Sequence, residues 1–315
     1  MDQLSVLVAG DYMLDHYYWG SCDRISPEAP VPILAVEKET WTLGGAGNVA
    51  NNLRSLGLSP LILGVLGADD GADKLRQQFQ LDQVDTEGLY EDGERVTTLK
   101  SRLIAGQQQM MRFDQESKQE IPTTLENVII DDLDGYLERV SAVILSDYGK
   151  GFLTPRLTQA LIKKAGRRGL PVFVDPKGRD YQKYQGATLL TPNRKEAEEF
   201  AGFSLQEIKQ IEQAAQKLRS DLDLEVAVIT LSEAGMAVCD REFNLVPTQA
   251  REVYDVTGAG DTSLAAFVYA WLENQTPVEC ARFANAAAAV VIAKLGSATC
   301  TLEEIARFQA KLPGT

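Results

Sequence analysis

The sequence predicts an α/β fold in which helices cover both faces of a mostly parallel sheet. Six short apolar segments have the length and composition of buried strands: 4–10, 61–67, 142–147, 171–175, 188–191 and 225–230. Segments of helical length lie between or after them, at roughly 45–56, 71–82, 155–168, 193–201, 205–221, 261–273, 278–294 and 302–311. Apolar strands that alternate with helices are typical of parallel sheets buried on both sides. We therefore expect one doubly wound domain over residues 1–315.

Two segments interrupt this alternation, at about residues 12–43 and 94–114. They are rich in Thr, Tyr, Trp and Val, and stretches such as R-V-T-T-L-K-S-R-L-I alternate polar with apolar residues, as strands with one solvated face do. Each follows a predicted strand of the main sheet. We expect them to form a small separate β-sheet, a lid over the carboxyl edge of the main sheet, where open α/β sheets bind ligands.

Charge and composition exclude several classes of protein. The chain has 31 Lys and Arg against 45 Asp and Glu, a net charge of −14, which argues against a nucleic-acid or anionic-membrane partner. No apolar run approaches the roughly 18 residues of a membrane span. Four cysteines without a C-x-x-C pair indicate reduced thiols and a cytoplasmic location. His16 is the only histidine, which rules out His-rich metal sites.

The stretch D-V-T-G-A-G-D-T-S at 255–263 is the strongest candidate for chemistry. Gly258, Ala259 and Gly260 leave the peptide N–H groups of this loop accessible, and a helix is expected to follow. A helix N-terminus carries unpaired N–H donors and partial positive charge, so it binds anions. Asp261 is either a carboxylate held beside an anion cradle or a simple helix cap.

A second glycine-rich stretch, G-A-G-N-V-A at 45–50, fits the G-x-G-x-x-G/A dinucleotide pattern, and Asp69 follows it at a strand end. An NAD-dependent oxidoreductase is therefore an alternative function. The dinucleotide fingerprint needs a buried strand directly upstream, and V-E-K-E-T-W-T-L is too charged to be one.

Several blocks together carry a resemblance to a known family. They are G-D-Y-M-L-D-H-Y at 10–17, R-I-S-P-E-A-P-V-P-I at 24–33, G-G-A-G-N-V-A-N-N-L at 44–53, L-S-D-Y-G-K-G at 145–151, D-P-K-G-R-D-Y at 175–181, G-A-T-L-L-T-P-N-R-K-E-A at 186–197, P-T-Q-A-R-E-V-Y-D-V-T-G-A-G-D-T at 247–262 and F-A-N-A-A-A-A-V-V-I-A-K-L-G-S-A-T at 283–299. The chain resembles the ribokinase-like (PfkB) carbohydrate kinases and, within them, the D-glycero-D-manno-heptose 7-phosphate kinases.

This resemblance implies ATP-dependent phosphorylation of the anomeric hydroxyl of a heptose 7-phosphate, giving the 1,7-bisphosphate. That step belongs to ADP-heptose synthesis for the lipopolysaccharide core. Some members carry a further nucleotidyltransferase half with an H-x-G-H motif, so the chain is either a stand-alone kinase or the kinase part of a longer protein. Another sugar or sugar-phosphate kinase of this fold, or a nucleotide-binding protein without catalysis, are the remaining alternatives.

The resemblance also assigns roles to residues. It makes Asp261 the catalytic base, with the amides of Gly258, Ala259 and Gly260 around the transferring phosphoryl group. It implies a Mg-ATP site at Asn193 and Glu196, partly through water; the alternative is a helix capping box. The other expected nucleotide contacts are Thr230, Ser232, Gly235 and Asn285.

For the sugar, the resemblance implies contacts from Asp11, Asp15, Gly44, Gly45 and Asn48. The 7-phosphate requires cations, and the candidates are Lys177, Arg102 and Arg112, with Lys100 a weaker one. Asp255 and Thr257 match a potassium-binding loop of many relatives. Lid strands of this family often pair between protomers, so a homodimer is expected.

Overall fold

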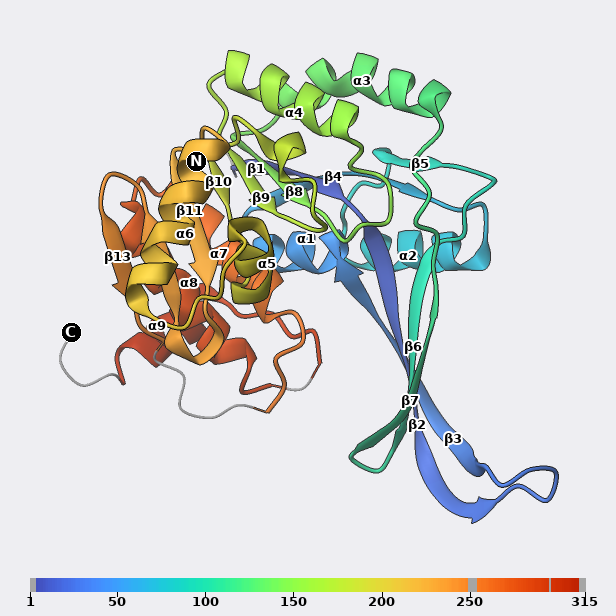
Figure 1. Ribbon diagram of the computed structural model, residues 1–315. Helices are drawn as coiled ribbons and strands as arrows, with labels where there is room; N and C mark the ends of the chain where they lie inside the picture. The colour runs from blue at the N-terminus through green and yellow to red at the C-terminus, as the bar shows by residue number, and fades with distance from the viewer. Residues whose placement is uncertain (1–3, 249–253, 295, 312–315) are drawn as a thin grey trace.

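The structure is a computed structural model that describes residues 4–248, 254–294 and 296–311. Its centre is a nine-stranded sheet in the order β13-β12-β11-β10-β9-β8-β1-β4-β5 (Figure 1). The strands are β1 (Ser5–Gly10), β4 (Ser59–Leu66), β5 (Leu89–Glu91), β8 (Ala142–Ser146), β9 (Val172–Asp175), β10 (Leu189–Leu190), β11 (Val226–Thr230), β12 (Met236–Cys239) and β13 (Phe243–Val246). All neighbouring pairs are parallel except β11–β12 and β12–β13. The predicted mostly parallel sheet is confirmed.

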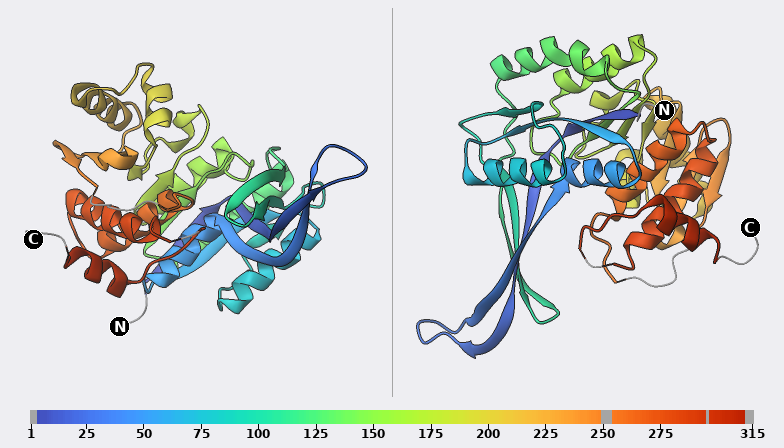
Figure 2. Two further views of the ribbon diagram at one scale, coloured as in Figure 1. Left: turned by 90° about the horizontal axis from the view of Figure 1, so that it is seen from below. Right: turned by 180° about the vertical axis from the view of Figure 1, so that it is seen from behind.

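Helices cover both faces of this sheet (Figures 1 and 2). On one face lie α1 (Ala46–Ser55), α2 (Asp70–Leu81), α7 (Ala259–Leu272), α8 (Pro277–Val291) and α9 (Leu302–Gln309). On the other lie α3 (Thr123–Leu137), α4 (Pro155–Arg167), α5 (Arg194–Ala201) and α6 (Ile208–Asp221). Successive side chains of a strand point to opposite faces. In β1, accordingly, Val6 and Val8 pack in one core and Leu7 and Ala9 in the other.

A separate four-stranded sheet, the lid, has the order β3-β2-β6-β7. Its strands are β2 (Tyr12–Ile25), β3 (Pro32–Gly45), β6 (Thr98–Ala105) and β7 (Gln108–Gln115), and it projects far from the body of the molecule (Figures 1 and 2). The expected small sheet is therefore confirmed. The glycine-rich stretch at 45–50 follows β3 of this sheet, not a buried strand of the main sheet, so it lacks the context of a dinucleotide fingerprint.

The order of the strands reverses direction between β1 and β8. The chain leaves β1 through the lid toward β4 on one side, and β8 pairs with β1 on the other side. Such a reversal is where open α/β sheets bind ligands, outside the carboxyl ends of the strands. Asp11 follows β1 and its N–H donates to the Ser146 carbonyl at 3.1 Å, at the end of β8. The loops after β1 and β8 therefore meet at the expected binding edge.

Candidate active site

Helix α7 begins two residues earlier than predicted, at Ala259. Its N-cap is Gly258, which has a left-handed φ of 76°. A Cβ at this position would lie 2.6 Å from the side-chain nitrogen of Asn48. Only glycine meets both conditions, because it tolerates positive φ and leaves room for a neighbouring group. The glycine thus lets α1 and the start of α7 approach each other.

The Asp261 carboxylate lies in the first turn of α7 and is 5% exposed. Asn48 donates to its Oδ2 at 2.7 Å, and the Tyr148 hydroxyl donates to its Oδ1 at 2.7 Å. Burial raises the pKa of Asp261 to about 6, although both hydrogen bonds oppose the shift. At neutral pH the group is an anion and a much stronger base than an exposed aspartate.

The amides before Asp261 form a smaller cradle than the glycine-rich sequence suggests. The Ala259 N–H donates to the Val256 carbonyl at 3.2 Å. Within the described chain, no acceptor pairs with the N–H groups of Gly258, Gly260 and Asp261. A Cβ at Gly260 would meet nothing within 4 Å. These three donors, at a helix N-terminus, remain free to bind an anion.

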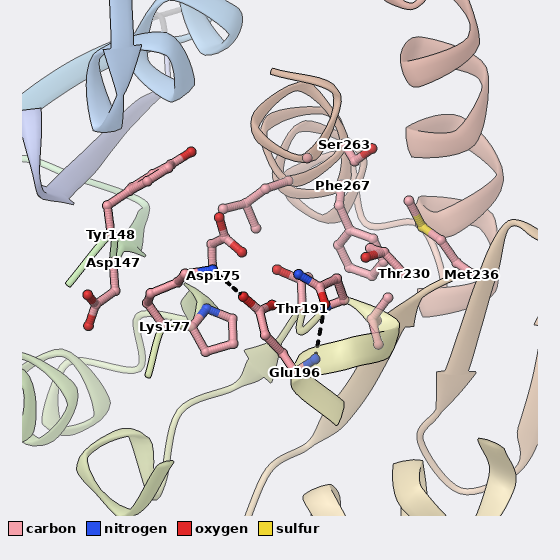
Figure 3. Close-up of a pocket in the computed structure, with 15 residues that line it drawn as sticks. Asp147, Tyr148, Asp175, Lys177, Thr191, Glu196, Thr230, Met236, Ser263 and Phe267 are labelled. Atoms are coloured by element: carbon pink, nitrogen blue, oxygen red, sulfur yellow. Dashed lines mark hydrogen bonds and ion pairs between the residues drawn. The ribbon is translucent and has the colours of Figure 1, made fainter. Parts of the chain in front are cut away.

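A cleft opens between α7 and the carboxyl ends of β8 to β11 (Figure 3). Its lining residues come from seven elements (β8, β9, β10, α5, β11, β12 and α7) or the loops after them: Asp147, Tyr148, Asp175, Pro176, Lys177, Thr191, Asn193, Glu196, Val228, Thr230, Met236, Gly260, Ser263, Leu264 and Phe267. Burial, together with the negative charges of Asp261 and Glu196, raises the pKa of Asp175 well above its usual value. The cleft therefore contains more acidic side chains than lysines, and this crowding favours the neutral form of Asp175.

Asn193 and Glu196 form a helix capping box. The sequence offered this as the alternative to a Mg-ATP site. The Asn193 side chain accepts from the Glu196 N–H at 3.0 Å, and Glu196 Oε2 accepts from the Asn193 N–H at 3.0 Å. Both residues also line the cleft, so capping does not remove them from a ligand site. Lys177, which the sequence grouped with the lid cations, instead donates to Glu196 Oε1 at 2.6 Å (Figure 3).

The other nucleotide candidates fall into two groups. Thr230 ends β11 and lines the cleft, next to Asn193 through a backbone bridge. Ser232 and Gly235 lie in the turn that follows, around the short helix η2 (Ser232–Ala234). Asn285 of α8 is buried and donates to the carbonyls of Val246 and Pro247 at 3.0 and 3.3 Å. Its amide fixes the chain after β13, a structural task that the sequence did not suggest.

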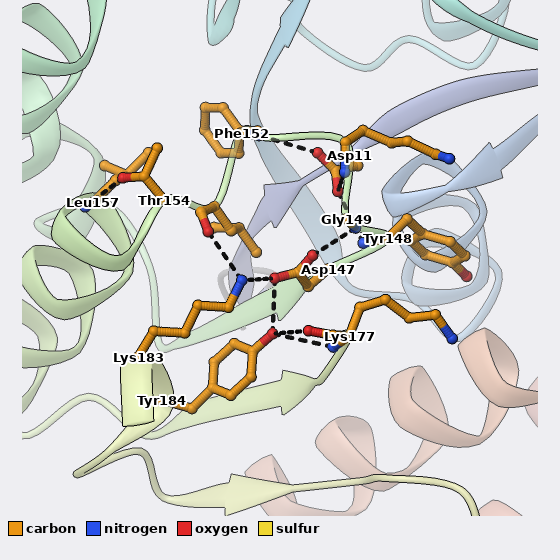
Figure 4. A network of polar contacts seen from close by, with 12 residues as sticks. Asp11, Asp147, Tyr148, Gly149, Phe152, Thr154, Leu157, Lys177, Lys183 and Tyr184 are labelled. Carbon is orange, nitrogen blue, oxygen red and sulfur yellow. Dashed lines mark hydrogen bonds and ion pairs between the residues drawn. The ribbon is translucent and has the colours of Figure 1, made fainter. Parts of the chain in front are cut away.

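Asp11 orders the loop after β8. Its Oδ2 accepts from the N–H groups of Tyr148 at 2.8 Å and Lys150 at 3.0 Å, and its Oδ1 accepts from Phe152 at 3.4 Å (Figure 4). Burial and the nearby Asp147 raise its pKa. The side chain predicted to contact the sugar therefore already holds the backbone that carries Tyr148.

The remaining sugar candidates gather at the base of the lid. Asp15 accepts from Arg102 at 2.5 Å. A Cβ at Gly44 would lie 2.6 Å from Asp15 Oδ2, and one at Gly45 would lie 2.5 Å from the Asp11 carbonyl. These two glycines thus let β3 pass close to both aspartates. Asn48, also predicted to contact the sugar, donates to Asp261.

Four cations lie together on and beside the lid. Lys100 and Arg102 are two positions apart in β6, so their side chains point to the same face of the lid. Arg102 lies directly opposite Arg112 of β7. Burial lowers the pKa of Lys100, and Lys150 and Arg102 lower it further. Carboxylates accompany these cations: Arg112 pairs with Asp114 at 3.0 Å, and Lys150 pairs with Glu116. A cationic site can thus exist in a protein of net charge −14.

Asp255 accepts from the N–H groups of Thr257 and Gly296, both at 2.9 Å. Burial is the largest single influence on the pKa of Asp255 and raises it, but these two bonds, the Thr257 side chain and the charge of Arg102 together outweigh burial and lower the pKa. The expected potassium loop thus contains a well-anchored carboxylate. Residues 249–253 before it lie outside the described residues.

The sequence analysis did not identify the aromatic and charged side chains that lie beside Asp261. Tyr148 contacts Asp261, and behind it Asp147 accepts from Lys183 at 2.5 Å and from the Tyr184 hydroxyl at 2.7 Å (Figure 4). The block L-S-D-Y-G-K-G contains Asp147 and Tyr148 directly after a predicted strand. That position at the binding edge was the available signal, but nothing in the pattern indicates which side chains meet.

Among the described residues, no group of three or more His, Cys, Asp and Glu side chains is arranged to hold a metal ion. No described helix combines the length and apolar composition needed to span a bilayer. The four cysteines are free.

Comparisons with known proteins agree with this geometry. The family model described as pfkB family carbohydrate kinase matches residues 4–305. The proteins named "Bifunctional protein HldE" of Aliarcobacter butzleri and Wolinella succinogenes are 48% and 49% identical to the chain, over 98% and 96% of it. The chain spans about 65% of the length of these relatives.

Solved structures share the fold at low sequence identity. Phosphofructokinase-2 from Escherichia coli in complex with potassium has a TM-score of 0.80 at 21% identity, covering 98% of this chain and 99% of that one. Arabidopsis thaliana ribokinase complexed with ribose and ATP has a TM-score of 0.75 at 21% identity, with the same coverage. The oxidoreductase alternative is therefore wrong, and the chain belongs to the pfkB family of carbohydrate kinases, phosphotransferases that act on a sugar hydroxyl.

Proposed function

We propose that this protein transfers the γ-phosphoryl group of ATP to the anomeric hydroxyl of D-glycero-D-manno-heptose 7-phosphate, giving the 1,7-bisphosphate for ADP-heptose and lipopolysaccharide core synthesis. The observation that carries the proposal is the buried Asp261 carboxylate, which follows the cleft residue Gly260 in α7 and interacts electrostatically with Lys100 of the lid. The resemblance of the motifs to heptose 7-phosphate kinases, and the similarity to HldE proteins over nearly the whole chain, support the choice of sugar.

In this mechanism Asp261 accepts the proton of the anomeric hydroxyl as its oxygen bonds to the γ-phosphorus. The bond between the γ-phosphorus and the bridging oxygen breaks, and ADP leaves. Such transfers pass through a loose transition state with negative charge on the transferring group. The N–H groups of Gly258, Gly260 and Asp261 would hold that charge; losing one such donor typically costs on the order of 3 kcal/mol.

Magnesium fits the oxygen chemistry of the cleft. Glu196 and Asn193 would hold it, partly through water, on the wall that Asp175 also lines. When bound, the ion neutralises charge on the ATP phosphates. Because Lys177 pairs with Glu196 on the same wall, we assign it to the triphosphate and not to the sugar phosphate. Thr230, Ser232 and Gly235 would complete the nucleotide side.

The sugar 7-phosphate would bind the lid cations. An anion there would relieve the repulsion that, after burial, lowers the pKa of Lys100. Arginine forks suit phosphate geometry, and Arg102 and Arg112 are direct neighbours across two strands. Asp15 and the Gly44–Gly45 turn would face the sugar hydroxyls.

Two further parts of the proposal concern a cation and the assembly. Asp255 and Thr257 would belong to a potassium site, as the structural similarity to a potassium complex of phosphofructokinase-2 suggests. Replacing K⁺ by tetramethylammonium should then lower the rate. Lid strands of two protomers would pair, since all eight residues of β7 are exposed.

The test is to incubate the protein with Mg-ATP and a panel of sugar 7-phosphates, sugar 6-phosphates and free sugars, following ADP release. We expect the heptose 7-phosphate to have the highest kcat/KM. Preference for another sugar would make the protein a different kinase of the same family. No turnover of any sugar would contradict the proposal and favour a nucleotide-binding protein without catalysis.

A further inference from the structure

Tyr148 connects three parts of the site. Its hydroxyl donates to Asp261 Oδ1 at 2.7 Å, its N–H donates to Asp11 Oδ2 at 2.8 Å, and its ring lies 5.6 Å from the Lys100 ammonium of the lid. The residue also lines the cleft. Its side chain is therefore fixed from the backbone side, the lid side and the carboxylate side.

The hydroxyl can act at Asp261 only as a donor. Burial and the negative charges of Asp261 and Asp175 raise the pKa of Tyr148 well above 10, so the phenol keeps its proton. A carboxylate oxygen can accept more than one hydrogen bond. Oδ1 can thus hold the tyrosine hydroxyl and still face an acceptor hydroxyl, while Asn48 occupies Oδ2.

We propose that Tyr148 is a positioning residue for Asp261. Its hydroxyl fixes the orientation of the carboxylate and favours the ionised form that accepts the sugar proton. The inference rests on the proposed function, because it assigns Asp261 the role of base. The lid contact through Lys100 also makes this orientation dependent on where the lid lies.

Charged groups from several elements surround Asp261. Asp15 of β2 and Asp175 at the end of β9 disfavour its anion, whereas Lys100 of β6 favours it. Burial remains the largest influence, and the hydrogen bond from Tyr148 opposes it most. Removing that bond alone should therefore make the carboxylate easier to protonate.

The test is the pH dependence of kcat/KM in Tyr148→Phe, which keeps the ring beside Lys100 and loses only the hydroxyl. We expect the acid limb of the kcat/KM profile to move to higher pH by roughly one unit. A hydrogen bond to a charged group stabilises that group by an energy that corresponds to about one pKa unit. Activity should then recover at alkaline pH. The matched control is Tyr184→Phe, which removes a similar 2.7 Å hydroxyl donor from Asp147 and should leave the limb where it is.

A second measurement needs no substrate. The side-chain carboxyl of Asp261 can be titrated by ¹³C NMR, with Asp261→Asn to assign the signal, and its midpoint should rise in Tyr148→Phe. An unchanged midpoint, or an equal loss of activity at every pH, would overturn the positioning role. A raised midpoint in a protein that phosphorylates no sugar would uphold this role and refute the proposed function instead.

Discussion

At the scale of single residues, Asp261 shows how reactivity and stability oppose each other. The group is 5% exposed, and burial raises its pKa from 3.8 to about 6. The folded protein therefore binds this proton more tightly than the unfolded chain does. The free energy of unfolding therefore falls as pH rises from about 4 to about 6. Above pH 6 the ionised Asp261 lowers it by the full amount, about 3 kcal/mol.

Asp261→Asn should therefore be more stable than the original protein at pH 8. The amide can still accept from Asn48 and can donate to the Tyr148 oxygen, so little hydrogen bonding is lost. We expect Tm to increase by several degrees and the gain to shrink as pH falls through 6 toward 4. Thermal unfolding of both proteins across this range checks the prediction; a gain that does not depend on pH would contradict it.

Lys177 and Arg112 provide a matched pair of cations for separating the two substrates. Lys177 pairs with Glu196 in the cleft, whereas Arg112 lies on the lid opposite Arg102. Lys177→Met should raise the KM for ATP about tenfold and Arg112→Met the KM for the sugar phosphate by a similar factor, as expected for one lost phosphate contact. Steady-state kinetics with each substrate varied in turn checks this. Equal effects on both KM values would show that the assignments are wrong.

At the scale of elements, strand β7 is an open edge. Its eight residues are all exposed, among them Met111 at 57% and Phe113 at 48%. Exposed apolar strand edges pair readily with another chain unless something protects them. This arrangement supports the proposed dimer through the lid.

Phe113→Glu should shift the protein from dimer to monomer, because it places a charge in an apolar contact. Light scattering coupled to size-exclusion chromatography measures the mass, and Phe203→Glu is the control, since Phe203 is also exposed but lies after α5. A monomeric original protein, or a variant that remains dimeric, would refute the lid interface.

The sequence predicted most elements because apolar runs and their separators indicate buried parallel strands and helices. The sequence analysis did not predict α3. This helix has many Asp residues, its N-cap is Pro122, and no side chain caps its first turn, so the usual signals of a helix start are absent. Its buried Ile129, Leu133 and Leu137 do follow helical spacing. It also missed β12 and β13, which are four residues each and owe their antiparallel pairing to tertiary contacts.

At the scale of the whole molecule, the site is assembled from distant segments. Asn48 and Asp261 are 213 residues apart in sequence and form a 2.7 Å hydrogen bond. Because β1, β8 and β9 are parallel neighbours, the residues that follow them lie at one edge of the sheet. Which side chains pair there could not be predicted, because loop conformation decides it: Tyr148 contacts Asp261 from a loop whose backbone is held by Asp11.

The charge of the molecule likewise depends on how distant segments are brought together. The chain carries a net charge of −14, yet Lys100, Arg102, Arg112 and Lys150 lie together on and beside the lid. Composition argues against a nucleic-acid partner only as an inference about the average surface. It could not place a local anion site, because that depends on strand register.

The most direct test of the account is the rate of phosphoryl transfer from Mg-ATP to D-glycero-D-manno-heptose 7-phosphate in a single turnover at pH 8, measured for the original protein and for Asp261→Asn. The account predicts that the variant binds both substrates but loses roughly 10²- to 10⁴-fold in rate, the usual contribution of a general base. Transfer at an undiminished rate in the folded variant would contradict it.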